Sequence, residues 1–195
     1  MTSIKPFQIE DLFEFNSVNL DPLTENFNIS FYLQYLNEWP QLFFKSVELS
    51  THFNQPHEIS GYMMGKTEGK LAKQEWHTHI TAVTVQDQYR RLGLASDLCL
   101  ELEKMTSVEP YSTLFVDLFV KVTNTLARQL YEKLGYSVYR RVVGYYGQVM
   151  PVDRENLNDE IDAFDMRKSL PRDVNNVTVR DNGDKVYVLP EEVNF

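Results

Sequence analysis

The sequence predicts an α/β (α+β) fold in which helices flank a central mixed β-sheet. Between residues 42 and 85, apolar and polar residues alternate with a period of two, which is typical of strands. After residue 94, segments with helical spacing alternate with strand-like segments. A strand meander followed by such an alternation indicates a mixed sheet with helices on its faces.

The first 41 residues are expected to form two helices. In residues 9–20 the apolar side chains recur roughly at helical spacing, and Asp21-Pro22 ends the run. Ser30 is predicted to cap a second helix over 31–38, which Trp39-Pro40 ends. Because this second helix is apolar nearly all round, we expect it to be buried on both sides or covered by a partner.

The remaining elements follow from the same periodicities. Strands are expected at 42–49, 58–66, 75–85, 114–120 and 136–147, and helices at 94–105 and 124–134. Residues 162–170 fit a last strand, whereas 171–195 are polar with little periodicity. The sequence therefore predicts one domain over 1–170 and a C-terminal extension over 171–195, in a chain long enough to bury a sizeable core.

Composition excludes several classes of protein. With 19 Lys and Arg against 28 Asp and Glu, the net charge is −9, which disfavours a nucleic-acid-coating protein and docking to an anionic membrane. The single cysteine, Cys99, excludes an intrachain disulfide and a multi-cysteine zinc site, and it is expected in the core. The first residues lack a basic and apolar leader, and no run of 18 apolar residues occurs, so we expect a cytoplasmic protein.

A short basic segment, Arg90-Arg91-Leu92-Gly93-Leu94-Ala95, lies between a predicted strand and a predicted helix. Gly and Ala let a phosphate approach the backbone, the first N–H groups of the helix point at it, and the two arginines add charged donors. The alternative is a helix start with two solvated arginines. The spacing matches neither a P-loop nor a dinucleotide-binding loop.

Arg90-x-x-Gly93-x-Ala95 resembles the pyrophosphate loop of the GCN5-related N-acetyltransferase (GNAT) superfamily, which has Arg or Gln, then x-x-Gly-x, then Gly or Ala. Residues 124–136 resemble the second half of that fold. Residues 145–168 are similar to N-terminal protein acetyltransferases, and 19–27, 31–40 and 75–79 resemble NatB catalytic subunits. The likeness runs from residue 1 to about 170, apart from a polar insertion near 51–57.

The resemblance implies an enzyme that transfers acetyl from acetyl-CoA, by direct attack in a ternary complex, to the α-amino group of nascent proteins. The expected substrates begin Met-Asp, Met-Glu, Met-Asn or Met-Gln. It also implies a large helical-repeat (TPR-like) auxiliary subunit that binds largely through residues 20–45. The enzyme would act at the ribosome and would need no metal ion.

Cofactor roles follow by the same resemblance. The backbone N–H of Val85 would polarise the thioester carbonyl, and Tyr131 would donate to the leaving thiolate. Without the resemblance, Tyr131 is equally well a helix residue packed beside Leu134. Asn124 opens a helix and suits both an N-cap and a pantetheine contact. The expected cofactor contacts are Val83, Val85, Arg90, Arg91, Gly93, Leu94, Ala95, Ser96, Asn124 and Tyr131.

Six residues are expected to contact the peptide. His79 and Thr81 share a strand face with Val83 and Val85, and His79 would donate to the side chain of the second residue. The resemblance also places His79, with Tyr131 and Val85, among the catalytic residues. Without the resemblance, a lone strand histidine such as His79 is more often structural, and the presence of His77 on the same face weakens its functional role further. By resemblance, Phe27 walls the methionine pocket and Glu25 faces the amine or its water. Tyr145 and Tyr146 close the groove, although strand alternation lets only one of them point inward.

Two other functions remain open. One is a GNAT enzyme that acts on lysine or a small amine, against which the segment 19–40 argues. The other is a catalytically silent interaction subunit that keeps the cofactor loop as structure. The general base is left unassigned, because an α-amino group with a pKa of about 7.7–8.0 is already partly neutral near pH 7.

Overall fold

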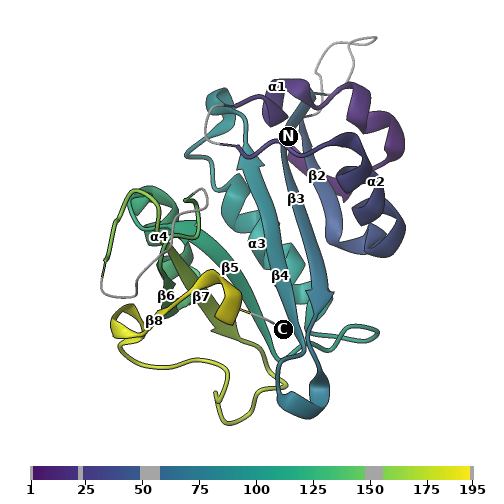
Figure 1. Cartoon of the computed structure of the whole chain (residues 1–195). Helices are drawn as coiled ribbons and strands as arrows, with labels where there is room; N and C mark the ends of the chain where they lie inside the picture. Colours follow the sequence, from purple (N-terminus) through teal and green to yellow (C-terminus); the bar gives the residue numbers. More distant parts are fainter. Residues whose placement is uncertain (1, 22–23, 49–57, 148–155, 194–195) are drawn as a thin grey trace. The chain divides into compact units, whose positions relative to one another are not determined.

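The computed structural model describes residues 2–21, 24–48, 58–147 and 156–193 (Figure 1). The polar insertion expected near 51–57 and part of the loop after Met150 lie outside these residues. The chain divides into two compact units, which are described separately. The first unit holds residues 1–66 and 80–108, and the second holds 67–79 and 109–195.

The first unit contains most of the predicted strand meander. Strand β1 (Thr2–Pro6) pairs antiparallel with β2 (Phe43–Glu48), and β2 pairs antiparallel with β3 (Glu58–Glu68). The next strand, β4 (His77–Val85), begins in the second unit and enters the first at Ile80. The strands expected at 42–49, 58–66 and 75–85 are thus confirmed, whereas β1 was not predicted.

A glycine allows β3 to approach its neighbours closely. A Cβ added to Gly61 would lie 2.7 Å from the carbonyl oxygen of Thr84 and 3.0 Å from Oγ of Ser46. The register of β2 and β3 also shifts between Ser46 and Val47. A side chain at position 61 would therefore have to displace backbone atoms of β4.

An aromatic core joins the first helices to the sheet. Phe7 stacks on Phe43 with ring centroids 4.1 Å apart, and Phe15 meets Tyr32 and Tyr62 edge to face. The hydroxyls of Tyr32 and Tyr62 both donate to Oδ1 of buried Asn19, at 3.0 and 2.9 Å. Burial raises the pKa of Tyr62, so this hydroxyl keeps its proton and remains a donor.

The helix starts differ from the sequence prediction. Residues 9–20 form a 3₁₀ turn at Ile9–Phe13 and a short helix α1 (Asn16–Asn19) rather than one helix, and the Asp11 carboxylate accepts from the Gln8 N–H and from Lys45. Helix α2 (Ile29–Glu38) is capped by Asn28, whose Oδ1 accepts from the Phe31 N–H at 2.9 Å. The expected cap, Ser30, instead donates to Asn28.

Helix α3 (Leu94–Thr106) completes the first unit and confirms the helix predicted at 94–105. Leu98, Cys99 and Leu102 on one face of α3 are fully buried. The free thiol of Cys99 therefore lies in the core, as expected.

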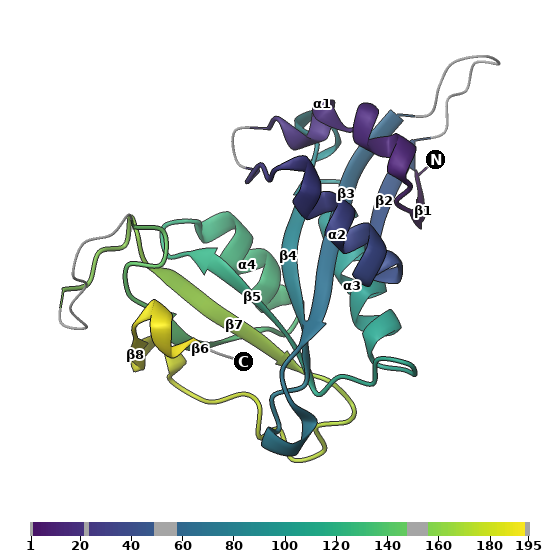
Figure 2. The same cartoon turned by 45° about the vertical axis from the view of Figure 1, so that its right-hand side comes forward.

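In the second unit, the start of β4 pairs in parallel with β5 (Phe115–Lys121) over three residue pairs, from His77–Phe115 to His79–Asp117. Strand β7 (Ala163–Ser169) pairs antiparallel with both β5 and β6 (Ser137–Val142), so it lies between them (Figure 2). Helix α4 (Thr125–Lys133) connects β5 to β6.

The C-terminal residues are ordered by polar contacts that periodicity did not reveal. Strand β8 (Tyr187–Val188) pairs in parallel with β6. The Asp173 carboxylate accepts from the backbone N–H groups of Val177 and Thr178 and from the Thr178 hydroxyl. Although burial alone would raise the pKa of Asp173, these hydrogen bonds lower it. The division into a domain and an extension at residue 170 stays a prediction.

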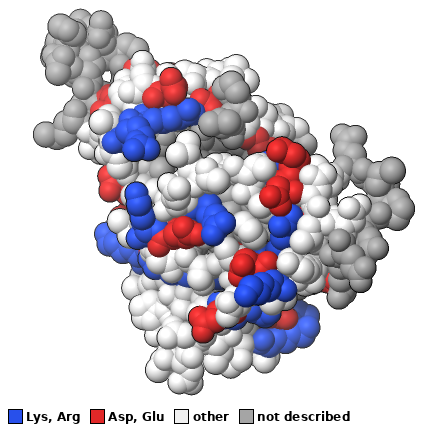
Figure 3. Space-filling view, turned by 90° about the vertical axis from the view of Figure 1, so that its left-hand side faces the viewer, with Lys and Arg blue, Asp and Glu red and all other residues white. Residues whose placement is uncertain are grey.

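The strands are hydrogen-bonded in the order β1-β2-β3-β4-β5-β7-β6-β8, with parallel and antiparallel pairs. The predicted mixed sheet with helices is confirmed. On the face in Figure 3, acidic and basic side chains are interspersed, so neither sign covers it. Within the described residues, no helix has the length and apolarity needed to cross a bilayer.

Candidate functional site

The loop after β4 leads into α3 through a left-handed glycine. Gly93 has φ 89° and is the N-cap residue, so no cap side chain covers the first N–H groups of α3. An added Cβ at Gly93 would meet no atom within 4 Å, so the glycine is required by its backbone conformation rather than by crowding. Four N–H groups at a helix start lack helical partners and suit an anion.

Arg90 braces this loop. Its Nε donates to the carbonyl oxygen of Val85 at 3.1 Å, and its two Nη atoms donate to Asp87 and Asp21 at 3.0 and 2.5 Å. Three of its five N–H donors are therefore used within the protein, whereas Arg91 is exposed and left-handed, with φ 65°. The sequence predicted two equivalent phosphate-binding arginines, but their environments differ.

Helix α2 positions the first unit's expected peptide contacts. Phe27 stacks on Phe31 with centroids 4.4 Å apart, and its N–H donates to the Tyr32 hydroxyl at 3.1 Å. The Thr81 hydroxyl is 2.6 Å from the hydroxyl of Tyr35. Glu25 is exposed. The expected residues of this unit are Glu25, Phe27, Thr81, Val83, Val85, Arg90, Arg91, Gly93, Leu94, Ala95 and Ser96.

In the second unit, His79 contacts a buried carboxylate. Nδ1 of His79 lies 2.8 Å from Oδ1 of Asp117, which is fully buried, while the His79 side chain keeps 13% exposure. Nε2 of His77 lies 3.5 Å from Oδ2 of the same carboxylate and 3.6 Å from Oε1 of Glu68. His77 is buried and stacks on Phe115. One carboxylate thus faces two histidines from one strand face.

Neighbouring charges shift the pKa values of two of these groups, His77 and Asp117. Burial alone would lower the pKa of His77, but the negative charge of Asp117 and the contact with Glu68 raise it. Burial alone would raise the pKa of Asp117, but electrostatic attraction to His77 and the hydrogen bond from His79 lower it. Asp117 therefore remains an ionised acceptor.

A ladder of rings extends from His79. Its ring centroid lies 5.5 Å from that of Phe119, which stacks on Tyr145 at 4.7 Å. Tyr146 meets Tyr145 edge to face, and its hydroxyl is 3.5 Å from the carbonyl oxygen of Phe119. The strand expected over 136–147 ends at Val142, so both tyrosines lie in a turn. Strand alternation therefore does not restrict them, and both gather beside Phe119.

Helix α4 carries two predicted cofactor residues. Asn124 caps it, with Oδ1 accepting from the Ala127 N–H at 3.2 Å, as expected. Tyr131 is the buried residue of α4 and meets Tyr136 edge to face at 5.7 Å. The second unit thus contains His79, Asn124, Tyr131, Tyr145 and Tyr146.

Sequence reasoning missed Asp117 and Phe119. The signal was present, because Asp117 interrupts the apolar strand LFVDLFV, and a charge in a buried strand requires a partner. Among the described residues, no three or more His, Cys, Asp or Glu side chains are grouped so that they could hold a metal ion.

Comparison with known proteins decides the family. The model of the acetyltransferase (GNAT) family matches residues 12–136. The chain belongs to the GNAT acetyltransferase family. This GNAT chain is 55% identical, over the whole of both chains, to the N-terminal acetyltransferase B complex catalytic subunit NAT3 of Saccharomyces cerevisiae.

Solved structures agree with this family assignment. A chain in a structure of the NatB acetyltransferase complex bound to a bisubstrate inhibitor is 68% identical, with a TM-score of 0.86 and 99% of each chain covered. Naa20 of Chaetomium thermophilum, in complex with a bisubstrate analogue, is 40% identical, with a TM-score of 0.81 over 99% of this chain and 100% of that one. This GNAT enzyme is therefore similar to NatB catalytic subunits over its whole length.

Proposed function

We propose that this enzyme is the catalytic subunit of a NatB-type complex and acetylates the α-amino group of nascent proteins that begin Met-Asp, Met-Glu, Met-Asn or Met-Gln. The observation that carries the proposal is the full-length likeness to NatB catalytic subunits, at 55% identity in sequence and a TM-score of 0.86 in structure. A lysine acetyltransferase of the same fold would not need this likeness in the α2 region.

The start of α3 fits the pyrophosphate of acetyl-CoA. Its N–H groups at Leu94, Ala95 and Ser96 offer donors, and an added Cβ at Gly93 would meet no other side chain or strand within 4 Å. Arg91 supplies an exposed charge, while Arg90 keeps the loop in shape. Acetyl-CoA supplies the activated acetyl thioester, and Val83 and Asn124 line its arm.

Two groups of the chain have separate catalytic roles. The backbone N–H of Val85 polarises the acetyl carbonyl, an effect often worth roughly 10²–10³ in rate. The hydroxyl of Tyr131 donates to the departing thiolate. No covalent acyl-enzyme is required, which agrees with the burial of Cys99 in the core.

The peptide contacts account for the choice of substrate. Phe27, held by its stacking on Phe31, walls the pocket for the initiator methionine, and exposed Glu25 faces the amine or its water. Thr81, held by Tyr35, contacts the second residue, and His79 lies two residues before it on the same strand face. Tyr145 and Tyr146, packed by Phe119, close over the peptide backbone.

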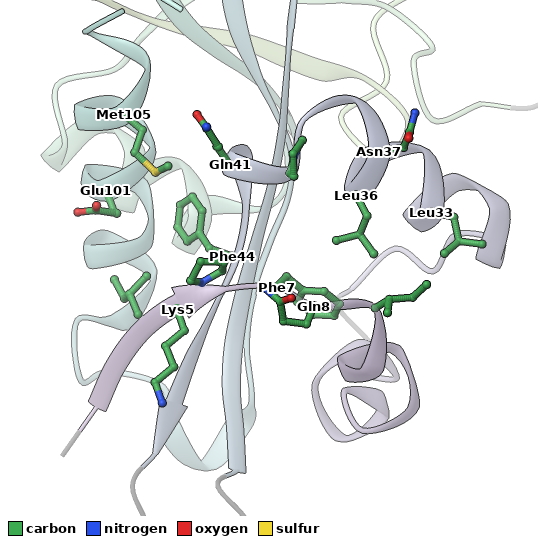
Figure 4. A pocket seen from close by; sticks show the side chains of 14 residues that line it. Lys5, Phe7, Gln8, Leu33, Leu36, Asn37, Gln41, Phe44, Glu101 and Met105 are labelled. Carbon is green, nitrogen blue, oxygen red and sulfur yellow. The ribbon is translucent and has the colours of Figure 1, made fainter. Parts of the chain in front are cut away.

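An apolar groove in the first unit supports a bound auxiliary subunit. The groove, of about 700 Å³, is lined by β1, the following 3₁₀ turn, α2, β2 and α3 (Figure 4). Leu33, Leu36 and Pro40 lie within the segment 20–45 expected to bind the partner, and Ile29 and Leu33 are exposed on α2. A large helical-repeat subunit, acting in the cytoplasm at the ribosome, would cover this face.

A peptide panel tests the function. The chain, co-expressed with the auxiliary subunit of its own organism, is expected to turn over acetyl-CoA on Met-Asp peptides and to leave Met-Leu and internal-lysine peptides nearly untouched. Preference for a lysine ε-amino group would overturn the proposal in favour of a different GNAT activity. Binding of CoA without turnover on any peptide would instead indicate a silent subunit.

A further inference from the structure

The contact between Asp117 and His79 determines where the protons on His79 lie. Nδ1 of His77 is 2.5 Å from the carbonyl oxygen of Glu75, which can only accept, so Nδ1 carries a proton. Its Nε2 faces the carboxylates of Asp117 and Glu68, which favour a second proton there. Although burial alone would raise the pKa of Asp117, His77 and the hydrogen bond from His79 lower it, so Asp117 is ionised.

An ionised carboxylate has no proton to donate. Nδ1 of His79, 2.8 Å from Oδ1 of Asp117, must therefore carry the shared proton. In neutral imidazole the other nitrogen, Nε2, is then an acceptor. The sequence-based role of His79, as a donor to the second residue of the peptide, would require an imidazolium instead.

We propose that Asp117 is a positioning residue that makes Nε2 of His79 the general base for the substrate's α-ammonium group. This inference rests on the proposed function. Asp117 fixes the tautomer and the ring orientation, and His79 takes the proton directly or through one water. Phe119, which packs against both His79 and Tyr145, is a second contact that holds the His79 ring.

The proton balance is complete. One proton passes from the α-ammonium to Nε2 of His79, and the neutral amine forms the N–C bond to the acetyl carbonyl. The C–S bond breaks, and the second proton of that nitrogen ends on the CoA thiolate. The His79 imidazolium then releases its proton to water. The products are the acetylated peptide, CoA thiol and one proton.

Three other charged or titratable side chains, on β3, β4 and β7, lie near the Asp117–His79 pair. His77 lies on β4, Glu68 at the end of β3, and Arg167 on β7 directly opposite Asp117 in the strand register. Arg167 is itself held by Asp165 through two hydrogen bonds of 3.1 Å. A neutral residue at 117 would therefore change the tautomer of His79 and the charge balance around His77 together, so a control must separate the two effects.

Substrate protonation provides the kinetic test. In wild type, kcat/KM on a Met-Asp peptide should persist below the pKa of the amine, because His79 takes the proton. In Asp117→Asn the amide can donate to Nδ1 and leave the proton on Nε2, so only amine that is already neutral reacts. With an amine pKa of about 7.7–8.0, the loss should be about tenfold at pH 7 and should vanish above about pH 9.

His79→Ala should show the same rescue at high pH, and it covers the case in which Asp117→Asn does not fold. The matched control is Glu68→Gln, the same carboxylate-to-amide change beside His77 but not at His79, and it should keep the wild-type profile. A loss of kcat/KM that is equal at every pH would overturn the proposal. A loss confined to the Met-Asp over Met-Leu preference would return His79 to the role of a donor.

Nitrogen NMR separates this inference from the proposed function. In the full chain labelled with ¹⁵N-histidine, four histidines give signals, and His79→Ala assigns one of them. We expect neutral His79 to be protonated at Nδ1 and bare at Nε2, and the reverse in Asp117→Asn. The opposite tautomer in wild type would refute the proposed role of Asp117 and His79, even if the enzyme acetylates Met-Asp peptides. The expected tautomer in an enzyme that does not acetylate the peptides would instead show that the proposed function is wrong.

Discussion

Substitution of Gly93 by aspartate should place a negative charge where the pyrophosphate of acetyl-CoA is expected to bind. The new side chain has room, because no atom lies within 4 Å of an added Cβ. It would stand at the N-cap of α3, where a carboxylate accepts from the free N–H groups and occupies the anion site itself.

The size of the effect follows from two opposing terms. Any L-residue with φ near 89° is strained by roughly 1–2 kcal/mol, but an N-cap carboxylate returns about 1 kcal/mol, so the domain should stay folded. Two unit charges about 4 Å apart repel by about 1 kcal/mol in water and about 4 kcal/mol near a protein surface. We therefore expect CoA affinity to fall by roughly 5- to 1000-fold.

The assay is calorimetric titration of CoA, with a thermal melt of each variant. Gly93→Asn is the matched control, because it has the same shape and backbone strain without the charge. Asparagine should weaken CoA binding much less than aspartate, and the difference should shrink at high salt. Equal losses in both variants would mean that backbone conformation, not charge, matters at position 93, and an unchanged affinity for aspartate would refute the anion site.

Three further outcomes are expected. Tyr131→Phe should lower kcat by roughly 10- to 1000-fold with little change in the KM for acetyl-CoA, measured by steady-state kinetics, and a pure KM effect would assign Tyr131 to packing. Tyr62→Phe should lower the free energy of unfolding by about 1 kcal/mol in urea, because Asn19 keeps only its bond from Tyr32, and no loss would show that the Tyr62 bond is not stabilising. Because the pKa of His77 is raised in the folded state, its stabilisation is complete below its unfolded pKa of about 6.5 and is lost as pH rises through the folded value. Urea melts from pH 6 to 9 should show this decline, and Glu68→Gln should make it smaller while Asp117 keeps part of it.

Much of the fold was accessible from the sequence, because long runs with a clear period specify their own elements. The strands around 58–66 and 114–120 and the helix at 94–105 lie within a few residues of β3, β5 and α3. The cap of α2 was displaced by two residues, since Asn28 and Ser30 are both good caps and only Asn28 reaches the Phe31 N–H.

What the sequence did not reveal depends on distant partners. Strand β1 is five residues long and ends in proline, and its pairing residues lie about 40 positions away in β2, so no local pattern marks it. The same applies to β8, which pairs over two residues with β6. Arg90 and Arg91 are adjacent and chemically identical, and their roles differ because Arg90 donates to Val85, Asp87 and Asp21.

The candidate site was predicted in part. The motif at 90–95 located the start of α3, and Asn124 was correctly placed as a cap. The buried carboxylate beside His79 was missed, because a strand residue gains such a role only through its neighbour in the sheet. The turn that contains Tyr145 and Tyr146 was read as strand, since its aromatic residues have high strand propensity.

The division of β4 between two compact units has a consequence for synthesis on the ribosome. A nascent chain that has emerged as far as Val108 already contains every residue of the first unit. The first residues of β4, His77 to His79, still lack their strand neighbours, Phe115 to Asp117, which are translated later. His79 thus acquires its carboxylate partner only after α3 and the loop before it are complete. Arrest of translation between residues 108 and 117 would leave a chain that has its anion-binding loop but lacks the Asp117–His79 pair.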